Sequence, residues 1–94
     1  PKSYVDMAWI LGQLGIIQRE LGNYETAKTY LEKSLSIIRK YRPSDHIDTA
    51  WVFEHLGVIY KELGSYIKAK ELIESSLNFY KKHCNEDDVY VAWD

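Results

Sequence analysis

The sequence predicts an all-α fold, a right-handed α-solenoid (an α-α superhelix) built from helical hairpins. Two observations carry this prediction: a long segment of the sequence repeats, and within each repeat the apolar residues recur at helical spacing. A third observation supports it, because 5 glycines and 2 prolines in 94 residues leave few turns for a domain of many short strands. The apolar fraction of 46% is sufficient for a folded core.

The repeat has a period of 42 residues. Ala8-Trp9 recurs as Ala50-Trp51 and again as Ala92-Trp93, and about 16 residues are identical when the two full copies are aligned without gaps. We therefore interpret residues 1–94 as a single array fragment. It comprises a first repeat at 8–49, a second at 50–91 and the start of a third at 92–94.

Each repeat is predicted to be a helical hairpin with a short turn. We expect helices at about 5–21, 24–41, 46–63 and 66–83, with a fifth starting near 88. Gly22 and Gly64 stand where a left-handed C-terminal cap is needed, and Asn23 and Ser65 can cap the following helices through their side-chain oxygens. The predicted packing stripe of the first helix contains Ile10, Leu11, Leu14, Gly15, Ile17 and Leu21, and that of the second contains Tyr24, Ala27, Leu31, Ser34, Leu35 and Ile38.

Two interior glycines predict close contacts between the helices of each hairpin. A glycine inside a helix costs about 0.8–1 kcal/mol relative to alanine. Gly15 and Gly57 nevertheless occupy equivalent interior positions in the two repeats. We therefore expect a neighbouring helix to pass too close for a side chain there, with Ala27 and Ala69 on the facing helices.

Composition and motifs argue against several classes of function. A net charge of -2 gives no electrostatic support for binding nucleic acid or a membrane surface, and no apolar run is long enough to span a bilayer. The single cysteine, Cys84, cannot form an intramolecular disulfide or a multi-cysteine zinc site. Asp45, His46 and Asp48 are better explained as helix-capping acids beside a solvated histidine than as metal ligands. We expect no enzyme activity and no cofactor, since no nucleotide-binding or nucleophile motif is present.

The side of the first helices that points away from their hairpin partners carries the candidate binding site. Stepping around the helical wheel from Leu14 and Gly15 leads to apolar and charged residues on the opposite side. In the first repeat this surface comprises Trp9, Gln13, Ile16, Arg19 and Glu20, flanked also by Gly12. In the second repeat it comprises Trp51, Glu54, His55, Val58, Lys61 and Glu62. Each tryptophan can either line this surface or pack between the repeats, and the sequence leaves both roles open.

The pattern resembles the tetratricopeptide repeat family. The carrying motifs are Leu11-x2-Leu14-Gly15, Gly22-x-Tyr24-x2-Ala27 and Leu31-x2-Ser34-Leu35, with Phe53-x2-Leu56-Gly57-x2-Tyr60 and Gly64-x-Tyr66-x2-Ala69 in the second repeat. The period of 42 is more similar to the kinesin-light-chain-like class than to the 34-residue form. Ser34 and Ser76 depart from the alanine that is frequent at that position.

The resemblance implies that the candidate residues line a concave groove. In chaperone-binding members of the family, Lys and Asn side chains hold the terminal carboxylate of the ligand. The resemblance implies that the matching positions here are Gly12, Ile16, Glu54 and Val58, so these Lys and Asn side chains are absent. An acidic chaperone tail is therefore not the expected ligand.

The predicted function is a protein–protein interaction scaffold that binds a peptide or protein segment along the groove. Two alternatives stay open: a structural segment that self-associates end to end through exposed repeat ends, and a regulatory part of a larger enzyme or signalling protein. Because the sequence begins at Pro1, we expect that an N-terminal segment is missing. A cytoplasmic location is the default for a chain with one cysteine and no signal peptide.

Overall fold

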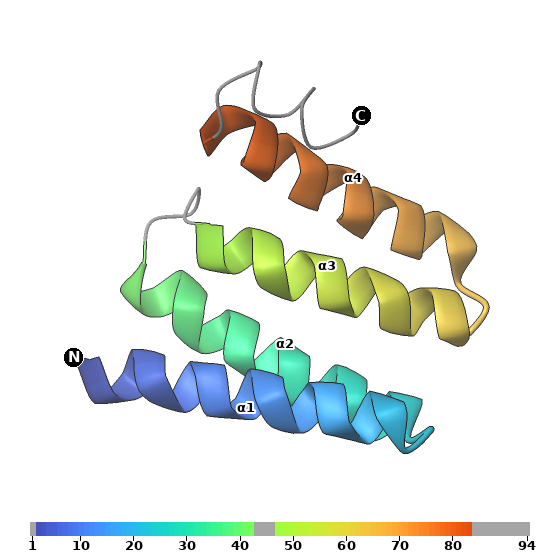
Figure 1. Ribbon diagram of the computed structural model, residues 1–94, viewed down its shortest axis with the longest axis horizontal. Helices are drawn as coiled ribbons and strands as arrows, with labels where there is room; N and C mark the ends of the chain where they lie inside the picture. The colour runs from blue at the N-terminus through green and yellow to red at the C-terminus, as the bar shows by residue number, and fades with distance from the viewer. Residues whose placement is uncertain (1, 43–46, 84–94) are drawn as a thin grey trace.

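The computed structural model describes residues 2–42 and 47–83, and this part of the chain is helical throughout apart from its turns. The helices are α1 (Lys2–Glu20), α2 (Tyr24–Tyr41), α3 (Ile47–Glu62) and α4 (Tyr66–His83), as Figure 1 shows. The predicted all-α fold is confirmed. The bounds of α2 and α4 equal the predicted ones, whereas α1 begins earlier than expected. The predicted fifth helix lies outside the described residues.

The tight turns between α1 and α2 and between α3 and α4 have the same structure. Gly22 and Gly64 both have φ of 84°, a left-handed conformation that glycine adopts without the steric cost of a Cβ atom. The Gly22 amide donates to the Arg19 carbonyl (2.9 Å) and the Asn23 amide to the Gln18 carbonyl (2.8 Å). This pair of hydrogen bonds is the Schellman motif, so the predicted glycine caps are confirmed.

The side-chain cap predicted for Asn23 is wrong. Asn23 makes no side-chain hydrogen bond to the first amides of α2, and its Nδ2 instead donates to Gln18 Oε1 at 2.9 Å. The backbone carbonyl of Asn23 accepts the Ala27 amide (2.9 Å) as α2 starts. The side chain is drawn back towards α1 because the Schellman turn places Asn23 next to the last turn of that helix.

Each hairpin is held together where its two helices approach most closely. A Cβ atom added to Gly15 would lie 2.9 Å from Leu31 Cγ and 3.2 Å from the Ala27 carbonyl oxygen. A Cβ atom on Gly57 would lie 2.5 Å from Ile73 Cγ1 and 3.2 Å from the Ala69 carbonyl oxygen. Neither glycine position has space for a side chain, and Ala27 and Ala69 are the facing residues, as predicted.

A buried hydrogen bond recurs beside each close contact. Ser34 Oγ donates to the Ala8 carbonyl at 2.8 Å, and Ser76 Oγ donates to the Ala50 carbonyl at 2.9 Å. Ser34 and Ser76 are buried, so each hydroxyl needs this partner to offset the loss of water. The serines that depart from the usual alanine therefore link the two helices of each hairpin.

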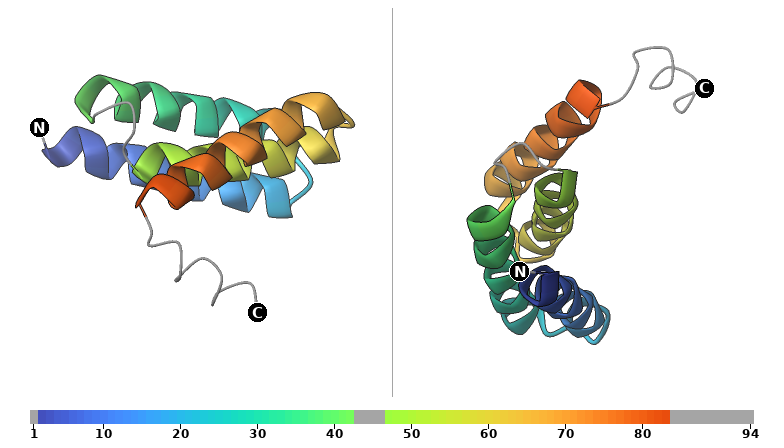
Figure 2. Two further views of the ribbon diagram at one scale, coloured as in Figure 1. Left: turned by 90° about the horizontal axis from the view of Figure 1, so that it is seen from above. Right: turned by 90° about the vertical axis from the view of Figure 1, so that its left-hand side faces the viewer.

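The two hairpins pack side by side, with α2 contacting both α1 and α3. In Figure 2 (right), α1 and α3 lie on one side of the molecule, and α2 and the N-terminal half of α4 lie on the other. The largest fully buried side chains are Leu31, Ser34 and Ile38 of α2 and Val52 and Ile59 of α3. The core is therefore centred on the junction between the hairpins.

The predicted packing stripe is correct for α2 but wrong for much of α1. Ala27, Leu31, Ser34, Leu35 and Ile38 are buried as expected. Ile10, Leu14, Ile17 and Leu21 of α1 are exposed. Their equivalents in the second hairpin are buried, apart from the half-buried Leu63. In that hairpin α3 packs against α2, whereas no described helix covers this side of α1. Helical periodicity identifies an apolar face, but only the neighbouring helices determine whether it is covered.

We predict that Gly15→Ala destabilises the protein by about 1–3 kcal/mol, although alanine is the better helix former by about 1 kcal/mol. The new methyl group would press on Leu31 and on the Ala27 backbone, which cannot move without shifting α2. The free energy of unfolding in urea measures the effect. Ser36→Ala, at an exposed position of α2, is the control and should leave stability nearly unchanged.

Ile17 and Ile59 provide a matched pair, since they are equivalent positions with 52% and 0% of their surface exposed. We predict that Ile59→Ala lowers the free energy of unfolding by about 2–5 kcal/mol because it leaves a cavity in the core. Ile17→Ala should cost less than about 1 kcal/mol. Equal effects in urea denaturation would contradict the assignment of the core to the α2–α3 junction.

Candidate functional site

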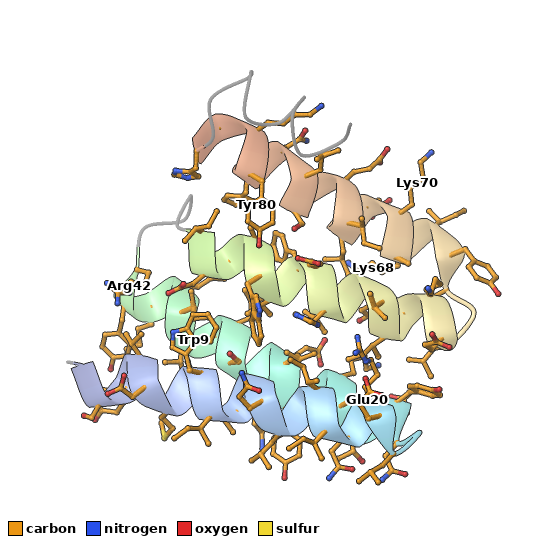
Figure 3. All side chains as sticks on the ribbon, in the orientation of Figure 1. Trp9, Glu20, Arg42, Lys68, Lys70 and Tyr80 are labelled. Atoms are coloured by element: carbon orange, nitrogen blue, oxygen red, sulfur yellow. The ribbon has the colours of Figure 1, made fainter. Side chains whose placement is uncertain are left out.

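The candidate site lies between α1 and α3, and we call this region the α1–α3 groove. It comprises Trp9, Arg19 and Glu20 of α1 and Trp51, His55, Val58 and Glu62 of α3. Figure 3 shows Trp9 near the N-terminal end of α1 and Glu20 at its C-terminal end, both on the face where α1 and α3 lie side by side. The groove therefore has two ends with different chemistry, an aromatic end near Trp9 and a charged end near Glu20.

The charged end contains a hollow of about 340 Å³. It is lined by Arg19 and Glu20 of α1, Tyr24 of α2, and Val58 and Glu62 of α3. Arg19 and Glu20 form an ion pair at 2.8 Å, so the Arg19 charge is largely balanced within the protein. Within the described part of the chain Glu62 has no such partner, which leaves the hollow with an excess of negative charge.

The aromatic end is formed by three rings in contact. The ring centroids of Trp9 and Trp51 are 4.9 Å apart with an interplanar angle of 55°, and those of Trp51 and His55 are 4.6 Å apart at 56°. Both tryptophans are half-buried. A Cβ atom on Gly12 would lie 2.7 Å from the Trp51 ring, so Trp51 packs against the α1 backbone. The two roles left open by the sequence are combined: the rings pack between the hairpins and keep part of their surface exposed.

The fold perturbs the protonation of His55, which lies at the aromatic end of the groove. Its Nδ1 atom is buried and has no hydrogen-bond partner among the described residues. Burial lowers the pKa of His55 below its ordinary value of 6.5, with a smaller contribution in the same direction from Arg19 and an opposing one from Glu54. Neutral imidazole is favoured because a buried charge loses its solvation.

The structure brings most, but not all, of the predicted site residues together. Arg19, Glu20, Val58 and Glu62 share the hollow, and Trp9, Trp51 and His55 share the aromatic end. Glu54 instead lines a separate hollow between α3 and α4. The remaining predicted residues are Gln13 and Lys61, which are exposed, and Ile16, which is half-buried.

Two contributions to the groove are missing from the sequence-based description. Tyr24 is assigned there only to packing, yet it also lines the hollow because the short turn places the start of α2 beside the end of α1. Gly12 is named there only as a flanking residue, although its lack of a side chain admits the Trp51 ring. The sequence contained a signal for this close contact, because Gly12 is a glycine inside a helix and the equivalent residue of the second repeat is Glu54.

Metal chemistry and membrane insertion find no support in residues 2–42 and 47–83. No group of three or more His, Cys, Asp or Glu side chains in this part is placed to hold a metal ion. None of the helices there is both long and apolar enough to cross a bilayer. Asp45 and His46, which the sequence analysis weighed as metal ligands, lie outside the described residues. The single cysteine, Cys84, also lies outside them.

We predict that stability falls as the pH drops below 6.5, owing to His55. Because the folded state disfavours the proton, the unfolded chain binds it at higher pH, so the contribution of neutral His55 is complete above 6.5 and is lost on acidification. His55→Gln introduces the residue found at the equivalent position of the first repeat, Gln13. This variant should show a smaller change in the free energy of unfolding between neutral pH and the pH at which carboxylates begin to be protonated. Free energies of unfolding in urea across this range measure it.

The control for this prediction is Gln13→His, which adds an imidazole at an exposed equivalent position. It should add no comparable dependence on pH because the new group stays hydrated in both states. A His55→Gln profile as steep as that of the unmodified protein would show that other groups cause the pH dependence.

Comparison with known proteins identifies the family. The family model described as Tetratricopeptide repeat matches residues 6–82, which includes all four helices almost completely. No curated protein matches the chain. The paired helices, glycine-capped turns and close Gly–Ala contacts agree with this match, and the chain belongs to the tetratricopeptide repeat family.

Proposed function

We propose that the protein is a non-catalytic interaction module that binds a peptide or protein segment in the α1–α3 groove. The observation that carries this proposal is the hollow at the charged end, since four of its five lining residues are ones the sequence predicts for ligand binding. Tetratricopeptide repeats generally mediate protein–protein interactions, which makes a protein partner the appropriate class. The period of 42 residues further favours the kinesin-light-chain-like class within this family.

The aromatic end supplies the apolar part of the proposed site. Trp9 and Trp51 keep part of their ring surfaces exposed while each ring is held in place by its neighbours. Rigid aromatic side chains contribute large contact areas at a small entropic cost, and tryptophan is enriched among residues that dominate binding energy. An aliphatic or aromatic side chain of the ligand would pack there.

The charged end favours a basic ligand. Glu62 is unpaired in the described part of the chain, and the Arg19 charge is neutralised by Glu20. A Lys or Arg side chain of the ligand would complement the negative charge of Glu62, whereas a carboxylate would be repelled by it. We therefore propose a ligand that presents an apolar residue to the tryptophans and a basic residue to the hollow.

Selection of a phage-displayed library of random dodecapeptides on the full chain tests this proposal. We expect enrichment of sequences that combine an aromatic or aliphatic residue with Lys or Arg. Fluorescence anisotropy of the selected peptides should show that Glu62→Lys weakens binding about tenfold, or about 1.4 kcal/mol. Trp9→Ala should cost about 2 kcal/mol or more in binding.

Glu71→Lys is the matched control, because it makes the same change of charge at an exposed α4 residue that lines a different hollow, formed by α2, α3 and α4. It should leave peptide affinity unchanged beyond a small long-range effect. Thermal melts followed by circular dichroism separate lost binding from lost folding. Selected peptides that bind the Trp9→Ala and Glu62→Lys variants as tightly as the unmodified protein would refute the groove as the binding site.

A further inference from the structure

A second hollow, of about 370 Å³, lies on the opposite side of the molecule from the α1–α3 groove. α2 and α4 both pack against α3, and the hollow lies between them with α3 at its base. We call it the α2–α4 hollow. Along its length it is lined by one pair of residues from each helix, which are Glu32 and Arg39 of α2, Phe53 and Tyr60 of α3, and Lys68 and Ser75 of α4.

These pairs show that the α2–α4 hollow is elongated along the helices. The members of each pair are seven residues apart, which corresponds to two helical turns or about 10 Å. α2 and α4 run in the same direction and α3 runs in the opposite one, as Figure 1 shows. One end of the hollow therefore carries Arg39, Phe53 and Ser75, and the other carries Glu32, Tyr60 and Lys68. The Arg39 guanidinium lies 5.6 Å from the centre of the Phe53 ring, which agrees with this order.

The centre of the α2–α4 hollow is apolar. Each of the three helices contributes one leucine, and these are Leu35, Leu56 and Leu72. Each leucine is three residues from one member of the pair on its own helix and four residues from the other, so it lies between the two ends. Leu35 and Leu56 are buried and Leu72 is half-buried. An apolar side chain of a ligand would therefore pack at the centre.

The two halves of the hollow differ in charge. Arg39 makes its end positive. Glu71 lies one turn beyond Lys68 on α4, so the other half contains two carboxylates, of Glu32 and Glu71, and one ammonium group. None of these four charged side chains forms an ion pair with another residue in the described part of the chain. A complementary ligand therefore carries an anionic group at one end and a cationic group at the other.

Lys28 does not reverse the charge of the negative half. Its ammonium group lies 5.6 Å from the centre of the Tyr60 ring, close to this half of the hollow. It is already paired with the Glu25 carboxylate at 3.2 Å, so its charge is balanced within α2.

The repeat fold does not require the polar side chains that α4 contributes. Lys68, Glu71 and Ser75 correspond to Thr26, Thr29 and Lys33 in the first hairpin. That hairpin forms the same pair of helices and the same glycine-capped turn without them. The charge pattern of the hollow therefore needs an explanation other than folding.

We propose that the α2–α4 hollow is a second protein-binding site, which receives one face of an α-helix from a partner protein. In an α-helix, residues at i, i+3 and i+7 stand on one face and span about 10 Å. An acidic residue at i would bind Arg39 and Ser75, an apolar residue at i+3 would cover the leucines, and a basic residue at i+7 would lie near Glu32 and Glu71. This site faces away from the α1–α3 groove and does not depend on the function proposed for that groove.

Fluorescence anisotropy with a designed peptide and the full chain tests the proposal. The probe is a helical peptide of about 18 residues, built from alanine and glutamine, with Glu, Leu and Lys at positions i, i+3 and i+7. Its binding should saturate below about 1 mM, and Arg39→Glu and Glu71→Lys should each weaken it at least about tenfold. A peptide with Lys in place of the Glu should bind Arg39→Glu more tightly than it binds the unmodified protein, because the charges are then complementary again.

Lys33→Glu and Glu62→Lys are the matched controls. They make the same changes of charge at exposed residues outside the α2–α4 hollow, on the outer surface of α2 and in the α1–α3 groove. Each should leave the affinity for the peptide nearly unchanged. Arg39 and Glu71 are exposed as well, and circular dichroism melts report the folding of every variant.

Several outcomes would overturn the proposal. They are a peptide that does not bind below about 1 mM, equal affinities for the unmodified protein and for Arg39→Glu and Glu71→Lys, and a loss of binding in Trp9→Ala, which would place the peptide in the α1–α3 groove. A mass of the free protein that rises with concentration, and does so no longer in Arg39→Glu, would assign the hollow to a second copy instead.

Discussion

The close approach of two helix backbones inside each hairpin is the constraint on which the rest of the structure depends. A Cβ atom at Gly15 or Gly57 would lie only 3.2 Å from the facing Ala27 or Ala69 carbonyl oxygen and still closer to the Leu31 or Ile73 side chain. The buried Ser34 and Ser76 hydroxyls join the same helix pairs by hydrogen bonds to the backbone. Because these contacts fix the relative position of the two helices, they also fix the directions of the surfaces that each hairpin presents to its neighbour and to a ligand.

The junction between the hairpins follows from those directions and produces the groove. α2 covers the apolar side of α3, and Trp51 packs over Gly12 on the other side of the junction. This arrangement brings α1 and α3 alongside each other, so that Arg19 and Glu20 face Val58 and Glu62 across the hollow. The groove therefore uses side chains from both hairpins, and its shape depends on the same residues that stabilise the junction.

Most of the fold could be predicted from the sequence, because repetition, helical spacing and glycine caps are local signals. The candidate site was predicted less completely. The helical wheel placed Trp9, Ile16 and Glu20 on one side of a helix, but it could not show that Glu54 lies outside the groove. The position of Glu54 relative to the groove depends on how α1, α3 and α4 pack together. The exposure of Ile17 and the burial of Ile59 are equally non-local, because the same residue type at equivalent positions differs only in its neighbours.

The concentration of fully buried side chains in α2 and α3 has a consequence for the dynamics of the chain. Leu31, Ile38, Val52 and Ile59 all belong to these two central helices, whereas α4 buries only Ala69 and Ser76. In a repeat array each unit is stabilised mainly by its immediate neighbours. Backbone amides of α2 and α3 should therefore exchange their hydrogens only when the whole domain opens, while those of α4 exchange through local fraying. Protection from hydrogen exchange would decrease from the centre of the molecule towards α4.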